Sequence, residues 1–109
     1  MMFNPHKLPQ SVDDAVDILL SDLSLNSEIH MAAMKEEDIA GLHFSLGSAI
    51  RNEFGLWTGN EALMESCRKT SGDPHLHIDD ASRVIVKALW KRIKSSNILN
   101  REDWHGRQT

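Results

Sequence analysis

Apolar residues recur at steps of three and four along three segments of the chain, and this periodicity limits the possible fold more than any other feature. The segments are residues 12–23, 39–54 and 81–93. Steps of three and four return to the same side of an α-helix, whereas a half-buried strand alternates at every second residue. No segment alternates cleanly in that way. The sequence therefore predicts an all-α protein.

The chain of 109 residues fits one helical domain. We expect a small bundle of about four helices, with a core spanning about residues 8–94, a long central helix over residues 35–54, and a partly disordered tail over residues 95–109. A short helical segment adds to the bundle after a break at Leu25. The expected helices begin at Ser11, Ser27, Lys35, Thr58 or Asn60, and Ile78.

The expected central helix carries an unusually wide apolar sector. Phe44 and His43 extend the stripe that runs from Ile39 to Phe54. A sector of this width is typical of a helix with neighbours on more than one side. Gly47 lies in the same sector, and because glycine weakens a helix, we interpret it as a point where another backbone comes close.

The stretch "IRNEFGLWTGN", residues 50–60, ends this helix. Gly55 suits the left-handed position after a helix, and Leu56 can then contact Ile50 one turn back. The stop leaves four residues without an assigned role, and they are candidates for a polar pocket with an indole wall: Arg51, Asn52, Trp57 and Asn60. In the alternative interpretation, the arginine satisfies the carbonyls of a neighbouring helix end and the tryptophan covers the core.

Charge is unevenly distributed along the chain. Between Asp13 and Asp38 there are eight acidic residues and one basic residue, Lys35. Between Arg83 and Lys94 there are five basic residues and no acidic one. The formal net charge of −4 disfavours a nucleic-acid partner, which usually leaves a basic footprint on the protein.

On the last expected helix the basic residues form a stripe of Arg83, Lys87, Lys91 and Lys94, with Trp90 at its edge. An exposed indole beside cations is typical of a binding hot spot. We predict that this stripe contacts a protein partner or a second copy of the chain, with the acidic first helix as a counterpart within the fold or across a dimer. A solvated helix face is the plainer interpretation, and a nucleic-acid adaptor is a third.

A rival hypothesis is a small metal-dependent, hydrolase-like enzyme that uses His43, His75, His77 and Asp79. Two histidines two residues apart in a loop can point to one side, and a carboxylate could complete a divalent metal site. Spacing fixes no third ligand, and acids at positions 79 and 80 also suit a helix start. We therefore expect no structural metal, no cofactor and no catalytic residue.

The single Cys67 favours a reducing compartment, because it cannot form an intrachain disulfide. It lies on the apolar side of its expected helix, where a thiol is inert. The first ten residues contain two prolines and no long apolar run, which excludes a secretory signal or a membrane anchor there. We expect a cytoplasmic protein with no membrane partner.

Two blocks of sequence, "LHFSLGSAIRNEFGLWTGN" and "DDASRVIVKALWKRI", resemble the DUF6794-like family of small bacterial domains of unknown function. The resemblance spans about residues 8–94, and departures at Lys35 and Ile78 concern only helix starts. It implies an all-helical cytoplasmic domain and brings no catalytic residues. Together these features favour a non-enzymatic protein-interaction or regulatory module.

Overall fold

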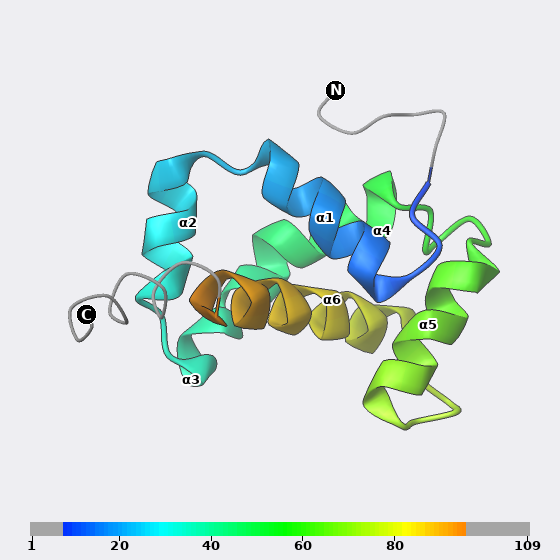
Figure 1. Ribbon diagram of the computed structural model, residues 1–109. Coiled ribbons are helices and arrows are strands. Elements are labelled where there is room, and N and C mark those ends of the chain that lie inside the picture. Colours follow the sequence, from blue (N-terminus) through cyan, green and yellow to red (C-terminus); the bar gives the residue numbers. More distant parts are fainter. Residues whose placement is uncertain (1–7, 96–109) are drawn as a thin grey trace.

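The computed structural model describes residues 8–95, which contain six α-helices, one π-helix and no strand (Figure 1). This confirms the predicted all-α class. The predicted disordered tail lies outside the described residues, apart from Ser95. The elements are α1 (Val12–Asp22), α2 (Leu25–Ala32), α3 (Glu36–Ile39), η1 (His43–Gly47), α4 (Ser48–Glu53), α5 (Glu61–Ser71) and α6 (Ile78–Ile93).

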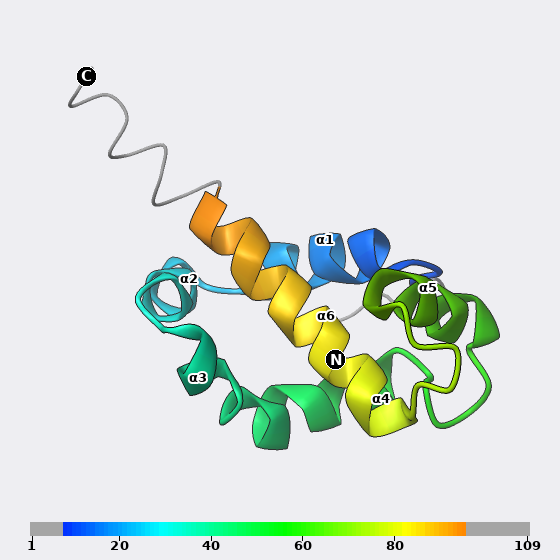
Figure 2. The same cartoon turned by 90° about the horizontal axis from the view of Figure 1, so that it is seen from below.

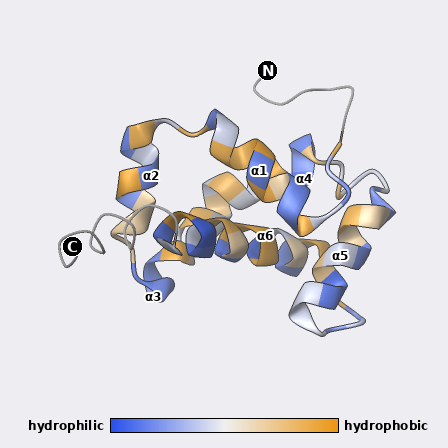
Figure 3. Cartoon of the chain, viewed as in Figure 1, coloured by the Kyte–Doolittle hydropathy of each residue, from blue (hydrophilic) through white to orange (hydrophobic). Residues whose placement is uncertain are grey.

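Helix α6 is the central helix of the described fold. It is also the longest, with 16 residues, and it packs against α1, α2, α3, η1, α4 and α5. Figure 2 shows α6 crossing the middle of the molecule with the other helices around it. Its inward residues Ile85, Leu89 and Ile93 are fully buried, and Figure 3 shows apolar residues recurring between polar ones along α6 and its neighbours. The expected central helix over residues 35–54 therefore does not have that role.

The segment over residues 35–54 is divided, which differs from the expected continuous helix. A turn at Ala40 and Gly41 separates α3 from the π-helix η1, and α4 follows directly. The wider turn of a π-helix changes the directions of its side chains relative to a 3.6-residue repeat. Extrapolating the apolar stripe therefore misplaces Phe44, whose side chain is 83% exposed. Gly47 is buried, but the close backbone approach there stays a prediction.

Helix starts follow the capping chemistry of short polar side chains. At α1, the Asp14 backbone N–H donates to the Ser11 hydroxyl at 3.0 Å, as predicted. At α2, the capping residue is Ser24 rather than Ser27. At α5, it is Asn60 rather than Thr58. Since several residues near each boundary can cap, tertiary contacts choose among them.

The stop after α4 has the predicted geometry. Gly55 has a φ of +76°, and the Leu56 N–H donates to the Arg51 carbonyl at 3.1 Å. This six-to-one hydrogen bond is the mark of a Schellman motif. Leu56 and Ile50 are both buried in the core. The turn thereby places Trp57 beside the start of α6.

Candidate functional site

Three basic residues of α6 form the outward-facing surface that we call the α6 face. Arg83, Lys87 and Lys91 are all exposed, and their spacing of four residues aligns them along one side of the helix. Three surface hollows, of about 430, 150 and 360 Å³, share these cations. Arg83 lines the first two hollows, and Lys87 lines the last two.

The hollows lie between α6 and three different neighbours. The first is bounded by Trp57 and the opening turn of α6. The second lies against α3, with Ile39 and Val86 among its apolar lining residues. The third lies against the end of α5 and is lined by Thr70, Ser71, Val84, Lys87, Ala88 and Lys91. Each hollow thus combines apolar surface with a cation, and carboxylates also line two of them: Asp79 and Asp80 the first, and Glu36 the second.

Two of the three cations of the α6 face are paired with exposed carboxylates. Arg83 Nε lies 3.8 Å from an Asp80 carboxylate oxygen, and Lys87 Nζ lies 2.6 Å from one of Glu36. A hydrogen bond from Lys87, together with its charge, lowers the pKa of the Glu36 carboxyl. Exposed pairs of this kind are screened by solvent and contribute little to stability. Lys91 makes no ion pair with any residue in 8–95, so the face can accept additional negative charge.

The indole on this face is that of Trp57, whereas the sequence had pointed to Trp90. Trp57 is 57% exposed and lines the same hollow as Arg83. Trp90 is half-buried, and its Nε1 donates to the Met34 carbonyl at 3.1 Å. Lys94 lies over the Trp90 ring at 5.3 Å from its centroid. Trp90 and Lys94 therefore belong to the contact between α6 and the segment after α2.

Arg51 connects α4 to the first turn of α6. Its NH1 donates to the Ser82 hydroxyl at 3.0 Å, and its Nε lies 3.6 Å from an Asp79 carboxylate oxygen. The side chain is only 14% exposed, and Nε makes no hydrogen bond within the described chain. Its Cζ lies 6.0 Å from the Trp57 ring centroid. Arg51 therefore joins α4 to α6 and lies against the ring of Trp57, which is on the turn after α4.

The other two members of the predicted pocket lie apart from this cluster. The Asn60 side-chain amide donates to the carbonyls of Pro9 and Phe54 at 2.9 and 2.8 Å. Its oxygen accepts from the Leu63 backbone N–H, so Asn60 is a structural connector. Asn52 is exposed on α4 and lines none of the three hollows. Of the four predicted residues, only Arg51 and Trp57 lie together.

The acidic side of α1 is paired within the fold, but not with the basic stripe. Arg92 NH1 lies 3.0 Å from Asp17, and its NH2 lies 3.8 Å from Asp13. Arg92 is not part of the basic stripe predicted from the sequence, which predicts no partner for it. The spacing of four between the two aspartates, which places both on one helix side, was the available signal. Because Arg92 pairs with these aspartates, the cations of the α6 face make no ion pair with α1.

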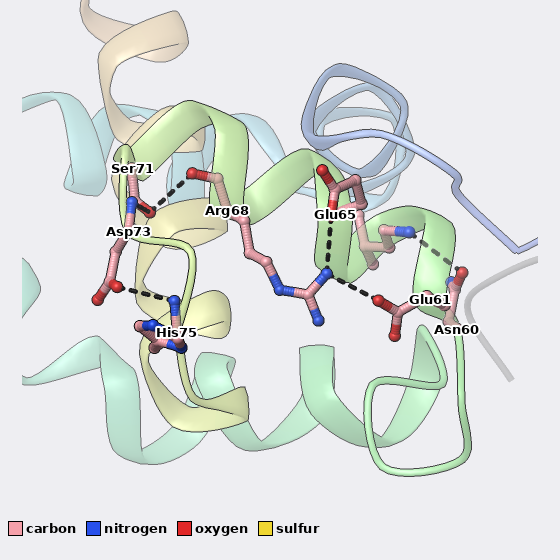
Figure 4. A network of polar contacts seen from close by, with 8 residues as sticks. Asn60, Glu61, Glu65, Arg68, Ser71, Asp73 and His75 are labelled. Atoms are coloured by element: carbon pink, nitrogen blue, oxygen red, sulfur yellow. Dashed lines mark hydrogen bonds and ion pairs between the residues drawn. The ribbon is translucent and has the colours of Figure 1, made fainter.

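The loop between α5 and α6 is held by short-range polar contacts (Figure 4). The Ser71 hydroxyl donates to the Arg68 carbonyl, and the Asp73 backbone N–H donates to that hydroxyl. An Asp73 carboxylate oxygen accepts from the backbone N–H of His75 at 2.9 Å. On α5, Arg68 bridges Glu61 and Glu65 at 2.7 and 2.8 Å. The Asp73 carboxylate thus stabilises the loop backbone.

Three residues of the rival enzyme hypothesis, His75, His77 and Asp79, do not form a metal site in the described part of the chain. Within residues 8–95, no three side chains of histidine, cysteine, aspartate or glutamate are grouped so that they could hold a metal ion. His75 and His77 are exposed, and Asp79 pairs with Arg51. The His43 side chain lies outside what the structure describes.

Cys67 is buried, and its Sγ lies 3.6 Å from the Ala81 carbonyl oxygen. Burial raises the pKa of this thiol to about 11. Since the thiolate is the reactive species, we expect native protein at neutral pH to resist iodoacetamide and to become labelled only on unfolding. Mass spectrometry with and without denaturant measures this. Equal labelling rates in both conditions would show that the thiol is accessible.

None of the helices in the described segment is both long and apolar enough to cross a membrane. No curated protein and no solved structure matches the chain. One family model does match, and it extends over residues 8–93, from before α1 to the last residue of α6. The match includes every helix described above and the whole α6 face. The chain therefore belongs to the family described as domain of unknown function DUF6794.

Proposed function

We propose that this protein is a non-enzymatic interaction module that binds an acidic protein surface through the α6 face, with Trp57 as its aromatic anchor. The observation that supports the proposal is the sharing of Arg83 and Lys87 among hollows that also have apolar walls. Tryptophan and arginine are enriched where binding energy concentrates. Charge orients an acidic partner on such a surface, and apolar area retains it.

The existing ion pairs of the face are compatible with this role. The carboxylates of Glu36 and Asp80 are more than half exposed, so their pairs with Lys87 and Arg83 exchange with solvent at little cost. A partner carboxylate can share or replace these contacts. Arg51 stays in place during such an exchange, because its contacts with Ser82 and Asp79 fix it beneath the indole.

A cytoplasmic location accompanies the proposal. The only cysteine is buried and unpaired, so the described fold does not depend on a disulfide. A reducing compartment suits such a chain.

Affinity capture with the full chain as bait tests the proposal. We expect the double variant Lys87→Glu/Lys91→Glu and the single variant Trp57→Ala each to lower recovery of the bound protein by about tenfold at low salt. Quantitative mass spectrometry of the recovered proteins provides the measurement. For the wild type, raising the salt concentration should also weaken binding, because exposed charges are screened.

Lys69→Glu is the matched control, since Lys69 is an exposed cation on α5 that lines a different hollow. It changes the net charge in the same direction but leaves the α6 face intact. We expect its recovery to equal that of the wild type. The proposal is wrong if all variants capture the same proteins equally, or if the control loses as much as the double variant.

A further inference from the structure

Helix α2 carries a pair of aliphatic side chains that the rest of residues 8–95 leaves exposed. Leu25 is 66% exposed and Ile29 is 47% exposed. Their spacing of four residues places them on one side of the helix. We call these two residues the α2 ridge. Adjacent aliphatic side chains exposed to this extent indicate a surface that another segment or molecule can cover.

The α2 ridge borders the contact between α2 and α6. An α-helix turns by about 100° per residue, which places Ala32 on the same flank of α2 as the ridge. Ala32 is buried, and its carbonyl accepts a hydrogen bond from Lys94 Nζ at 3.5 Å. Two residues further, the Met34 carbonyl accepts from the Trp90 indole. The last turn of α6 therefore lies at the C-terminal end of α2, close to the ridge.

The chain beyond Ser95 continues with two adjacent aliphatic residues, Ile98 and Leu99, which we call the aliphatic pair. The buried stripe of α6 does not extend to them. The positions three, four and seven residues beyond Ile93 are polar, namely Ser96, Asn97 and Asn100. These are the positions that would continue the stripe in a longer helix. The stripe of α6 therefore provides no place in the core for the aliphatic pair.

We propose that the aliphatic pair docks on the α2 ridge of its own chain. The contact places aliphatic side chains against aliphatic side chains, and the removal of both from water favours it. The inference goes beyond the proposed function, because the ridge lies on α2 and shares no residue with the α6 face.

The distances along the chain fit this contact. The aliphatic pair follows Ser95 by three and four residues, which an extended chain spans in about 10 to 14 Å. Ile29 precedes Ala32 by three residues, or about 4.5 Å along the axis of α2, and Leu25 precedes it by about 10 Å. Both ridge residues are therefore within reach of the chain that leaves α6.

Position favours this segment over residues 1–7, which also contain apolar side chains. The described chain begins at the other end of the fold. A Cβ at Gly55 would lie 3.3 Å from Leu8 Cδ1, and the Pro9 carbonyl accepts from the Asn60 amide at the start of α5. Figures 1 and 2 both place α5 and α2 at opposite ends of the described fold. Only the chain that follows α6 leaves the fold beside the ridge.

Disulfide trapping in the full chain tests the inference. We expect the double variant Ile29→Cys/Leu99→Cys to form an intrachain disulfide under mild oxidation at low protein concentration. Docking holds the two positions near the Cα separation of about 4.4 to 6.8 Å that a disulfide requires. The native Cys67 is buried and does not compete. Mass spectrometry without reductant measures the rate and shows whether the bond lies within one chain.

The matched control is His30→Cys/Leu99→Cys. His30 is an exposed neighbour of Ile29 at nearly the same height on α2, but it points about 100° further around the helix, away from the ridge. The length of chain that joins the two cysteines is almost unchanged. We expect the control to form its intrachain disulfide about tenfold more slowly, because docking raises the effective concentration only at the ridge.

Hydrogen exchange tests the same contact without added cysteines. In the full chain, Ile98→Asp/Leu99→Asp should make the backbone amides of α2 exchange about fivefold faster, because the helix loses its covering contact. The amides of α5, at the other end of the fold, should exchange as in the wild type. Circular dichroism checks that the variant keeps its helix content.

Any of three results would contradict the inference. Equal rates for the two cysteine pairs would show that the segment passes near α2 without docking on the ridge. Disulfides formed only between chains would show that the ridge contacts a second copy instead. The third result is unchanged exchange of α2 in the aspartate variant. None of them bears on the proposed function, which the capture experiment with Lys87 and Lys91 tests separately.

Discussion

Gly55→Val is expected to lower the free energy of unfolding by about 3 kcal/mol, one of the two largest effects that we predict for a single substitution. Gly55 has a φ of +76°, where a β-branched side chain is strained. A Cβ there would lie 3.3 Å from Leu8 Cδ1, 3.3 Å from Thr58 Oγ1 and 3.5 Å from Asn60 Cβ. Thermal unfolding should show a midpoint lower by roughly 15 °C.

Gly72→Val separates backbone strain from crowding. Gly72 ends α5 with a φ of +79°, almost the same as at Gly55, but nothing lies within 4 Å of its would-be Cβ. We expect this control to lose only about 1 to 2 kcal/mol, the cost of the left-handed conformation alone. Equal losses at both positions would show that crowding adds nothing. An unchanged midpoint in Gly55→Val would mean that the helix does not end there.

Some elements could be predicted because a single local signal determines them. The apolar stripe of α6 is continuous, and the structure buries Ile85, Leu89 and Ile93 where that stripe places them. The Ser11 cap and the Gly55 stop are likewise local, since each needs only one side chain or one backbone conformation. Of these elements, the Gly55 stop lies directly before Trp57 and ends α4 there.

The division of residues 35–54 could not be predicted from periodicity. A stripe shows which side chains share a helix side, but it does not distinguish hydrogen bonds four residues apart from the wider spacing of η1. Ile39, Ile50 and Phe54 are buried in either case. Phe44 lies within the π-helix, and its exposure depends on the spacing that the stripe leaves undetermined.

The sequence was enough to predict which cations of the candidate site align, but not which tryptophan lies beside them. A spacing of four along a long helix is enough to align Arg83, Lys87 and Lys91. Which indole is exposed depends on tertiary contacts that sequence does not reveal. Trp90 finds a carbonyl acceptor on Met34, 56 residues away, and so becomes half-buried. Trp57 lies on a turn whose backbone hydrogen bonds are made by its neighbours Leu56, Thr58 and Asn60. Leu56 enters the core, and the ring of Trp57 stays at the surface.

Asn60→Asp should cost about 3 kcal/mol of stability although it changes one atom group. The Asn60 amide nitrogen donates to the carbonyls of Pro9 and Phe54, and a carboxylate would place an acceptor against both. The cap of α5 survives, because aspartate also accepts from the Leu63 N–H. Urea unfolding measures the loss, which therefore reports the two donated bonds rather than the cap.

The matched control is Asn52→Asp, the same chemical change at an exposed position on α4. Near a helix C-terminus a new carboxylate should cost less than about 1 kcal/mol. Lowering the pH should return part of the Asn60→Asp loss relative to wild type, since a protonated carboxyl can donate one hydrogen bond. If both variants lose the same amount, or if acid restores nothing, Asn60 does not join the N-terminal segment, the α4 stop and α5 through its amide.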